Sequence, residues 1–253
     1  MTVVRTTRVV CCLVILGVAV VVLSSWGLNR QVVAQEPKAD KKKWPNAWVP
    51  EGKLRGILHF DGRQNAGGLK LWQPFCERHG LVWFPHEGGD ILQEKLLAEI
   101  AAELKHTELV RAPVIRVGLS ANGGYSIQLA HQHADRMLAC VAIAPLCPFA
   151  KGNEGFNFNR INEKGNLEGK VYDISQSLRV PCILQAGEND PVCGTIMAYG
   201  LTDYARSQNA PWTYFCMPRG GHGNVVPSEL FIAWLDAVIT QRLPKEVDLS
   251  KGA

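Results

Sequence analysis

The sequence lacks the residue spacings that build structural zinc sites, because it contains no Cys-x-x-Cys pair and no compact cluster of cysteine and histidine. We therefore expect no metal site. It also has no internal repeat and no low-complexity tract, which argues against a solenoid or an array. Of its eight cysteines, two lie in the first 34 residues. The other six permit disulfides, with their pairing left open, and they are Cys76, Cys140, Cys147, Cys182, Cys193 and Cys216. Cys140, Cys182 and Cys216 stand in apolar, strand-like runs and are expected to be buried.

An excess of charge is also missing once the N-terminal segment is set aside. The whole chain has 27 basic and 23 acidic side chains, and the three arginines of residues 1–34 leave 24 basic and 23 acidic ones. This balance offers no phosphate-binding surface, so we expect no nucleic-acid partner. Lysines 41–43 are expected to be part of a solvated linker.

The first 34 residues contain no acidic side chain and join a basic start to an apolar run. Arg5 and Arg8 precede the run from Val9 to Leu23, which at about 15 residues is shorter than the ~20 residues of a membrane span. This pattern predicts a secretory signal peptide, cleaved after Ala34, and an exported protein (periplasmic or secreted). An uncleaved N-terminal membrane anchor is the alternative. Residues 35–50 are expected to be a linker, and residues 51–253 a single domain.

Short apolar runs alternate with segments of helical periodicity through this domain. Continuous apolar strands separated by helices predict an α/β fold with a mostly parallel sheet and helices on both faces. Residues 148–177, rich in asparagine and glycine, interrupt the pattern and are expected to form a loop or a small cap. The expected strands are 54–60, 81–84, 113–119, 139–144, 181–186 and 212–217, and the expected helices are 69–79, 91–105, 123–133, 195–208 and 228–242.

Three residues with complementary chemistry each follow an expected strand. Ser120 and Asp190 come just after apolar runs, and His222 follows the last one, among glycines. Because the carboxyl ends of parallel strands share one edge of a sheet, we expect these side chains to meet there. A serine hydroxyl needs a base to take its proton, and the base needs a carboxylate to orient it, so the pattern predicts nucleophilic catalysis by serine. Glu188 is the alternative acid.

The intermediate of such a reaction carries a negative charge that backbone amides must stabilise. The amide of Ala121, at the beginning of the helix after the serine, is expected to be one donor of this oxyanion hole. The second donor is expected in residues 61–65, with Arg63 or Gln64 as the candidates.

The turn around the serine departs from the common Gly-x-Ser-x-Gly pattern. Gly118 stands at the first glycine position, but Asn122 replaces the second glycine. Asparagine tolerates unusual backbone angles, and Gly123 adds a small residue for close packing, so the turn remains a candidate nucleophile turn.

Residues 114–120, 134–139, 183–191 and 218–223 resemble the α/β-hydrolase superfamily, and within it the secreted esterase and poly-hydroxyalkanoate depolymerase-like group. Similarity to dienelactone-hydrolase and prolyl-oligopeptidase-type relatives is more distant. The resemblance implies Ser120 as nucleophile, His222 as base and Asp190 as acid, acting through an acyl-enzyme with no metal or organic cofactor. It also implies hydrolysis of a carboxylic ester, small or polymer-linked. A peptidase of related fold and a non-catalytic binding protein are the alternatives.

Overall fold

The computed structural model describes residues 43–61, 66–146, 174–223 and 229–249. The chain divides into two units, Met1–Asp40 and Lys41–Ala253, and only the second contains described residues. The expected signal peptide or anchor and most of the segment 148–177 lie outside the described residues and stay predictions. Among the described residues, no helix has both the length and the apolar character needed to cross a membrane.

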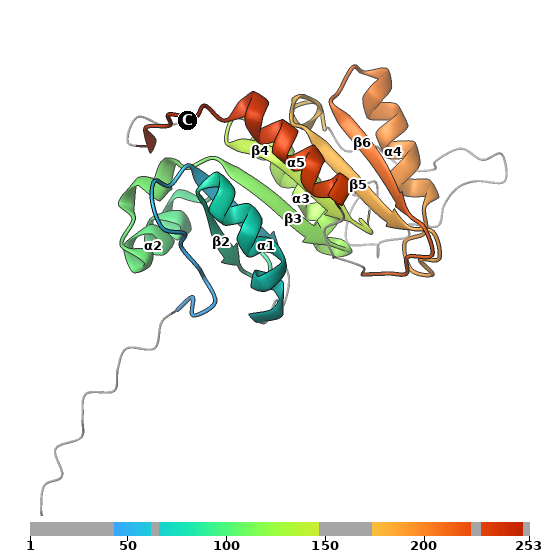
Figure 1. Ribbon diagram of the computed structural model, residues 1–253. Coiled ribbons are helices and arrows are strands. Elements are labelled where there is room, and N and C mark those ends of the chain that lie inside the picture. Colours follow the sequence, from blue (N-terminus) through green and yellow to red (C-terminus); the bar gives the residue numbers. More distant parts are fainter. Residues whose placement is uncertain (1–42, 62–65, 147–173, 224–228, 250–253) are drawn as a thin grey trace, which may run out of the picture. The chain divides into compact units, whose positions relative to one another are not determined.

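In its described residues, the second unit is built on one sheet of six strands, all parallel, in the order β2-β1-β3-β4-β5-β6 (Figure 1). The first strands along the chain therefore lie on one side of the sheet's centre and the last on the other, with β3 and β4 in the middle. The strands are β1 (Gly56–Asp61), β2 (Leu81–Pro85), β3 (Val114–Leu119), β4 (Met137–Ile143), β5 (Cys182–Gly187) and β6 (Trp212–Met217).

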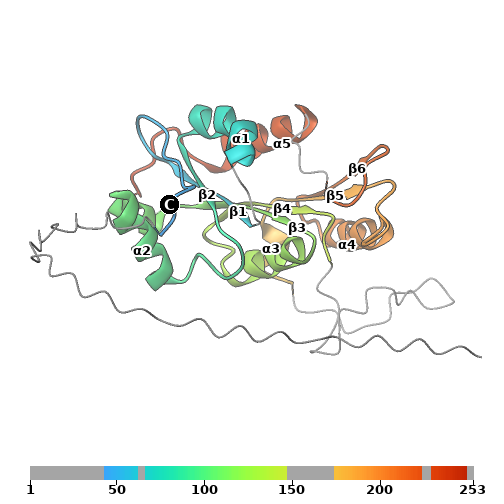
Figure 2. The ribbon, with the colours of Figure 1, turned by 90° about the horizontal axis from the view of Figure 1, so that it is seen from below.

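Helices cover both faces of this sheet (Figure 2). Helices α1 and α5 lie on one face, and α2, α3 and α4 lie on the other. The prediction of a mostly parallel sheet between two helical layers is confirmed. The helices are α1 (Ala66–His79), α2 (Glu94–Leu104), α3 (Ala121–Gln132), α4 (Ile196–Ser207) and α5 (Glu229–Arg242), with short 3₁₀ turns at Thr107–Arg111 and Ser177–Arg179.

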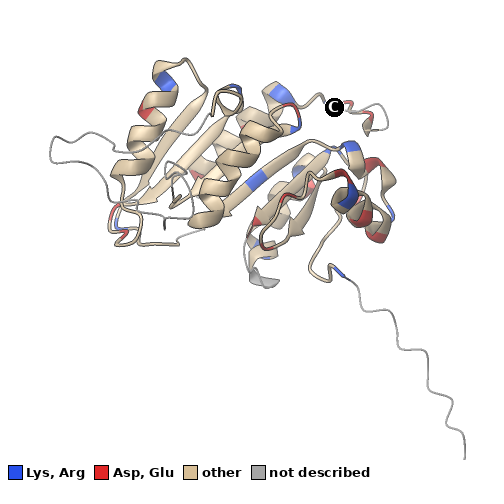
Figure 3. Cartoon of the chain, turned by 180° about the vertical axis from the view of Figure 1, so that it is seen from behind, with Lys and Arg blue, Asp and Glu red and all other residues tan. Residues whose placement is uncertain are grey.

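Burial follows from this layering. Strands β1, β4 and β5 are buried along their whole length, as expected for continuous apolar runs covered on two faces. Most charged residues lie on helices and loops, where Lys and Arg occur together with Asp and Glu (Figure 3).

The domain begins earlier than the expected boundary at residue 51. Trp44 is buried in the core, and Trp48 forms an isolated antiparallel bridge with Trp83 of β2 through two backbone hydrogen bonds of 3.0 and 2.9 Å. The end of the segment expected to be a linker is therefore packed on the domain, because its two tryptophans carry large apolar surfaces.

The cysteines also differ in part from expectation. Cys140 and Cys182 are buried as predicted, but the prediction for Cys216 is wrong, because that residue is exposed. Cys216 belongs to β6, which is one of the two edge strands of the sheet and is only partly covered. No disulfide joins the five cysteines within the described residues.

Candidate active site

Ser120 occupies a strained turn between β3 and α3. Its backbone angles are φ 57° and ψ −122°, a conformation that residues with a side chain rarely adopt and that is typical of strand-to-helix turns presenting a nucleophile. Backbone hydrogen bonds hold the turn from both sides. The Ser120 amide donates to Ile143 at the end of β4 (2.8 Å), and its carbonyl accepts from Gly123 and Leu146 (3.0 Å each).

Asp190 and His222 are hydrogen-bonded to each other beyond the ends of β5 and β6. The His222 Nδ1 atom lies 3.0 and 3.1 Å from the two carboxylate oxygens of Asp190. The Asp190 side chain is fully buried, and its Oδ1 atom also accepts the amides of Val192 (2.8 Å) and Cys193 (3.0 Å). Burial alone would raise the pKa of Asp190, but the hydrogen bonds from His222 and these amides outweigh it and lower the pKa.

This arrangement assigns the tautomer of His222. An ionised carboxylate only accepts hydrogen bonds, so Nδ1 carries the proton that faces Asp190. The Nε2 atom of a neutral ring is then left as an acceptor, the state that a general base requires.

The alternative acid, Glu188, points elsewhere. Its Oε2 atom accepts the backbone amide of Arg219 at 2.8 Å, so it fixes the loop that carries His222. The geometry therefore favours Asp190 as the partner of the imidazole.

Close backbone contact brings the loop of His222 against the end of β5. The Asn189 amide donates to the Gly220 carbonyl at 2.8 Å. A Cβ atom added at Gly187 would lie 2.5 Å from the Gly220 carbonyl oxygen and 2.6 Å from that of Gly221. Only glycine fits at position 187, because any side chain would push the histidine loop away from Asp190.

Cys193 links the serine to the Asp190–His222 pair. Its thiol is in side-chain hydrogen-bond contact with Ser120. Its Sγ atom, one carboxylate oxygen of Asp190 and one ring nitrogen of His222 all lie within 4.8 Å of one another. The three residues predicted from sequence therefore gather around one thiol at the carboxyl edge of the sheet. Sequence reasoning missed Cys193 as a neighbour of the site, although its place three residues after Asp190 was a usable signal.

Of the expected oxyanion donors, only Ala121 lies among the described residues. Ala121 is the first residue of α3, where amides have no partner inside the helix. Its amide has no backbone acceptor among the described residues and stands at the positive end of the helix dipole. Arg63 and Gln64 lie outside the described residues, so the second donor stays a prediction.

Comparisons with known proteins agree on the architecture. No protein-family profile and no curated protein sequence matches the chain. The crystal structure of esterase PE8 is 13% identical with a TM-score of 0.50, over 77% of this chain and 96% of that protein. The crystal structure of a thermostable esterase is 14% identical with a TM-score of 0.51, over 76% of this chain and 57% of that protein. The chain has the α/β-hydrolase fold. The narrower likeness to secreted esterases and poly-hydroxyalkanoate depolymerases stays a prediction.

Glycines on both sides of the serine make the α/β-hydrolase turn sterically feasible. A Cβ atom at Gly118 would lie 2.2 Å from the Asn122 carbonyl oxygen and 2.4 Å from the Ser126 Oγ atom. At Gly123 it would lie 3.1 Å from the Cα of Pro145. Glycine is thus obligatory at position 118, whereas position 123 could hold a larger residue only if its neighbours shifted slightly.

A buried ion pair joins two neighbouring strands of the sheet, close in sequence to the turn of Ser120. Arg116 of β3 contacts Asp61, the last residue of β1, and their side chains are 2% and 1% exposed. Burial lowers the pKa of Arg116 and raises that of Asp61, against the attraction between them. Arg116 also donates from a terminal nitrogen to His59 Nδ1 (2.8 Å), and His59 Nε2 donates to the His86 carbonyl (3.3 Å). His59 is therefore neutral, because burial and the positive Arg116 hold its pKa well below the usual value.

Hydrogen bonds connect this ion pair to Asn122 in a closed ring. Arg116 Nε donates to Ser126 Oγ (3.2 Å), which donates to the Asn122 carbonyl (2.8 Å). Asn122 Nδ2 in turn donates to the Asp61 carbonyl at 3.4 Å. The asparagine that replaces the usual second glycine thus ties the first turn of α3 to the end of β1. Sequence reasoning missed this ring, although an arginine inside an apolar strand was a signal for it.

The remaining histidines have structural partners. His133 Nε2 pairs with Asp90 at 2.7 Å, whereas His131 Nδ1 accepts the Gln176 amide at 3.4 Å. Two histidines near the C-terminal end of α3 thus make separate structural contacts.

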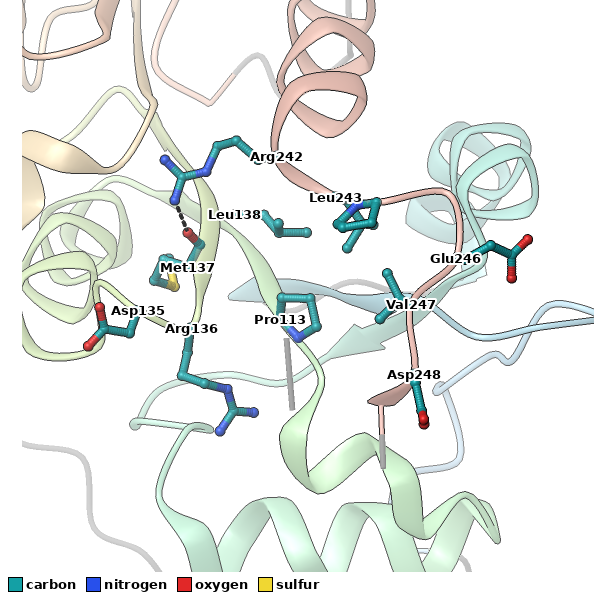
Figure 4. Close-up of a pocket in the computed structure, with 11 residues that line it drawn as sticks. Pro113, Asp135, Arg136, Met137, Leu138, Arg242, Leu243, Glu246, Val247 and Asp248 are labelled. Carbon is teal, nitrogen blue, oxygen red and sulfur yellow. Dashed lines mark hydrogen bonds between the residues drawn. The ribbon is translucent and has the colours of Figure 1, made fainter. Parts of the chain in front are cut away.

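A cavity of about 230 Å³ lies beside the amino-terminal ends of β3 and β4, whereas Ser120 follows the carboxyl end of β3. Figure 4 shows the residues that line this cavity. Pro113 before β3, Met137 at the beginning of β4 and Arg242 at the end of α5 line it, and Arg242 donates to the Met137 carbonyl at 3.4 Å. Ligands of open parallel sheets bind at the carboxyl ends of the strands, so this cavity is not the candidate active site.

Proposed function

We propose that this chain is a serine hydrolase that cleaves carboxylic esters through Ser120, His222 and Asp190. The observation that carries the proposal is the Asp190–His222 hydrogen bond beside the strained turn of Ser120. The fold shared with two proteins named as esterases supports the same reaction class.

In the proposed mechanism, His222 Nε2 takes the proton of Ser120 Oγ as this oxygen attacks the ester carbonyl. Asp190 holds the imidazole in the required tautomer and stabilises the imidazolium that forms. The Ala121 amide stabilises the oxyanion, together with an amide of residues 61–65. His222 then gives its proton to the leaving alcohol. Water, activated by the same nitrogen, hydrolyses the acyl-enzyme and frees Ser120.

The proposed substrate class is a small or polymer-linked carboxylic ester, and the proposed location is outside the cytoplasm, as the N-terminal pattern predicts. A cell fractionation with an antibody to the domain tests the location. Recovery of the protein only in the cytoplasmic fraction would contradict it.

The central experiment compares the native chain with Ser120→Ala. Hydrolysis of p-nitrophenyl acetate should fall by at least about 10⁴-fold, since the variant has no nucleophile. Ser207→Ala, at the exposed end of α4, is the matched control and should keep native turnover. Equal turnover by Ser120→Ala and the native chain would refute the proposal.

Two further assays separate the alternatives. A fluorophosphonate probe should label the native chain and not Ser120→Ala, whereas a non-catalytic binding protein would leave both unlabelled. A peptidase would cleave short peptide amides faster than short acyl esters, and we expect the reverse.

A further inference from the structure

The position of Cys193 has a consequence beyond ester hydrolysis. We propose that Asp190, Cys193 and His222 form an inhibitory binding site for a thiophilic divalent cation, with Zn²⁺ as the representative ion. The inhibition rests on the proposed function, whereas the binding itself does not.

The three side chains supply the donor atoms that Zn²⁺ prefers. A thiol sulfur, a carboxylate oxygen and an imidazole nitrogen lie within 4.8 Å of one another, and no other such group of three is found in the described part of the chain. Metal–ligand bonds of about 2.0–2.3 Å place tetrahedral ligands about 3–4 Å apart. The atoms therefore need to approach by roughly an ångström to share one ion.

The surroundings of the thiol favour such a site. The Cys193 amide donates to Asp190 Oδ1 at 3.0 Å, which keeps the cysteine folded against the carboxylate. The Ser120 hydroxyl contacts the thiol and offers a fourth oxygen donor, a place that a water molecule can also fill. Cys193 and His222 are only half-buried, so a cation reaches the site from solvent.

Binding of the cation releases one proton from the site and would stop the hydrolysis reaction. The thiol gives its proton to solvent, and its sulfur binds the ion as thiolate. If Nε2 of His222 is the ligand, the acceptor for the Ser120 proton is occupied. If Nδ1 is the ligand, its proton moves to Nε2, which then no longer accepts. In both cases the general base is lost.

Titration with ZnCl₂ during p-nitrophenyl acetate hydrolysis tests the proposal. The native chain should be inhibited, and EDTA should restore its activity. In Cys193→Ala and in the size-conserving Cys193→Ser, the Zn²⁺ concentration for half inhibition should rise at least about tenfold, as expected for loss of a ligand. Cys216→Ala, which removes an exposed thiol outside the group, should behave as the native chain. Unchanged inhibition of both Cys193 variants would overturn the proposal.

A readout without turnover separates this site from the proposed function. Co²⁺ in place of Zn²⁺ should give one equivalent of a thiolate-to-cobalt charge-transfer band in the native chain and in Ser120→Ala. The band should be absent in Cys193→Ala. A native chain without the band would overturn the cation site, whereas the band without any esterase activity would overturn only the proposed function.

Discussion

Removing one partner of the buried Arg116–Asp61 pair should destabilise the domain strongly. The two side chains are 2% and 1% exposed, so Arg116→Met leaves the Asp61 charge in the interior without a counter-ion. Such a loss costs about 3–5 kcal/mol of the free energy of unfolding, out of a total of about 5–15 kcal/mol. Asp61→Asn should cost a similar amount, because it leaves Arg116 as the unpaired charge.

The double variant should cost much less than the sum of the two single ones. With both charges gone, Asn at position 61 still accepts the Gly88 amide, which now donates to Asp61 Oδ1 at 2.8 Å. The main remaining defect is the Nδ1 atom of His59 without its donor, worth about 1–3 kcal/mol. The two single variants should together lose about 6–10 kcal/mol of the free energy of unfolding, whereas the double variant should lose about 1–3 kcal/mol. The difference is a coupling energy of about 3 kcal/mol or more.

Urea unfolding followed by tryptophan fluorescence measures these values, with the buried Trp72 and Trp83 as reporters. Arg78→Met is the control, since the Arg78–Asp236 pair is exposed and should be worth at most about 1 kcal/mol. Additive effects, with coupling below about 0.5 kcal/mol, would refute the reasoning that the buried charges depend on each other.

Gly118→Ala should lower the free energy of unfolding by at least about 2 kcal/mol, because its Cβ would lie 2.2 Å from the Asn122 carbonyl oxygen; a native urea midpoint would contradict this. The pKa of Asp190 is lowered in the folded protein, so its ionised carboxylate contributes fully to stability near neutral pH. This contribution is lost as the pH falls below about 4 and passes through the lowered pKa. The stability gap between the native chain and Asp190→Asn should therefore narrow toward about pH 3, and a constant gap in urea unfolding would refute the assignment. Burial and the charge of Asp190 raise the pKa of Cys193 to about 11. Its alkylation by iodoacetamide, followed by mass spectrometry, should quicken about tenfold per pH unit between about pH 7 and 10, and a plateau below about pH 9 would contradict the raised pKa.

The alternation of apolar runs and helical segments was enough to predict the sheet and its two helical layers. Each strand run is a local pattern, and burial on both faces forces it to be continuously apolar. The same pattern placed Ser120, Asp190 and His222 after strand ends, and parallel strands bring such positions to one edge. The pattern therefore predicts that they group together, without any measured distance.

Contacts across the fold decided the rest. The local sequence of Arg116 reads as part of an apolar strand, and only the pairing of β3 with β1 supplies the Asp61 carboxylate that makes its burial tolerable. The exposure of Cys216 depends on β6 lying at the sheet edge, which strand order determines. Cys193 meets Ser120 because two loops, about seventy residues apart in the chain, end at the same rim. The sequence by itself determined which residues have the required chemistry, whereas the tertiary structure decided which of them touch, because distance in space is set by packing and not by separation along the chain.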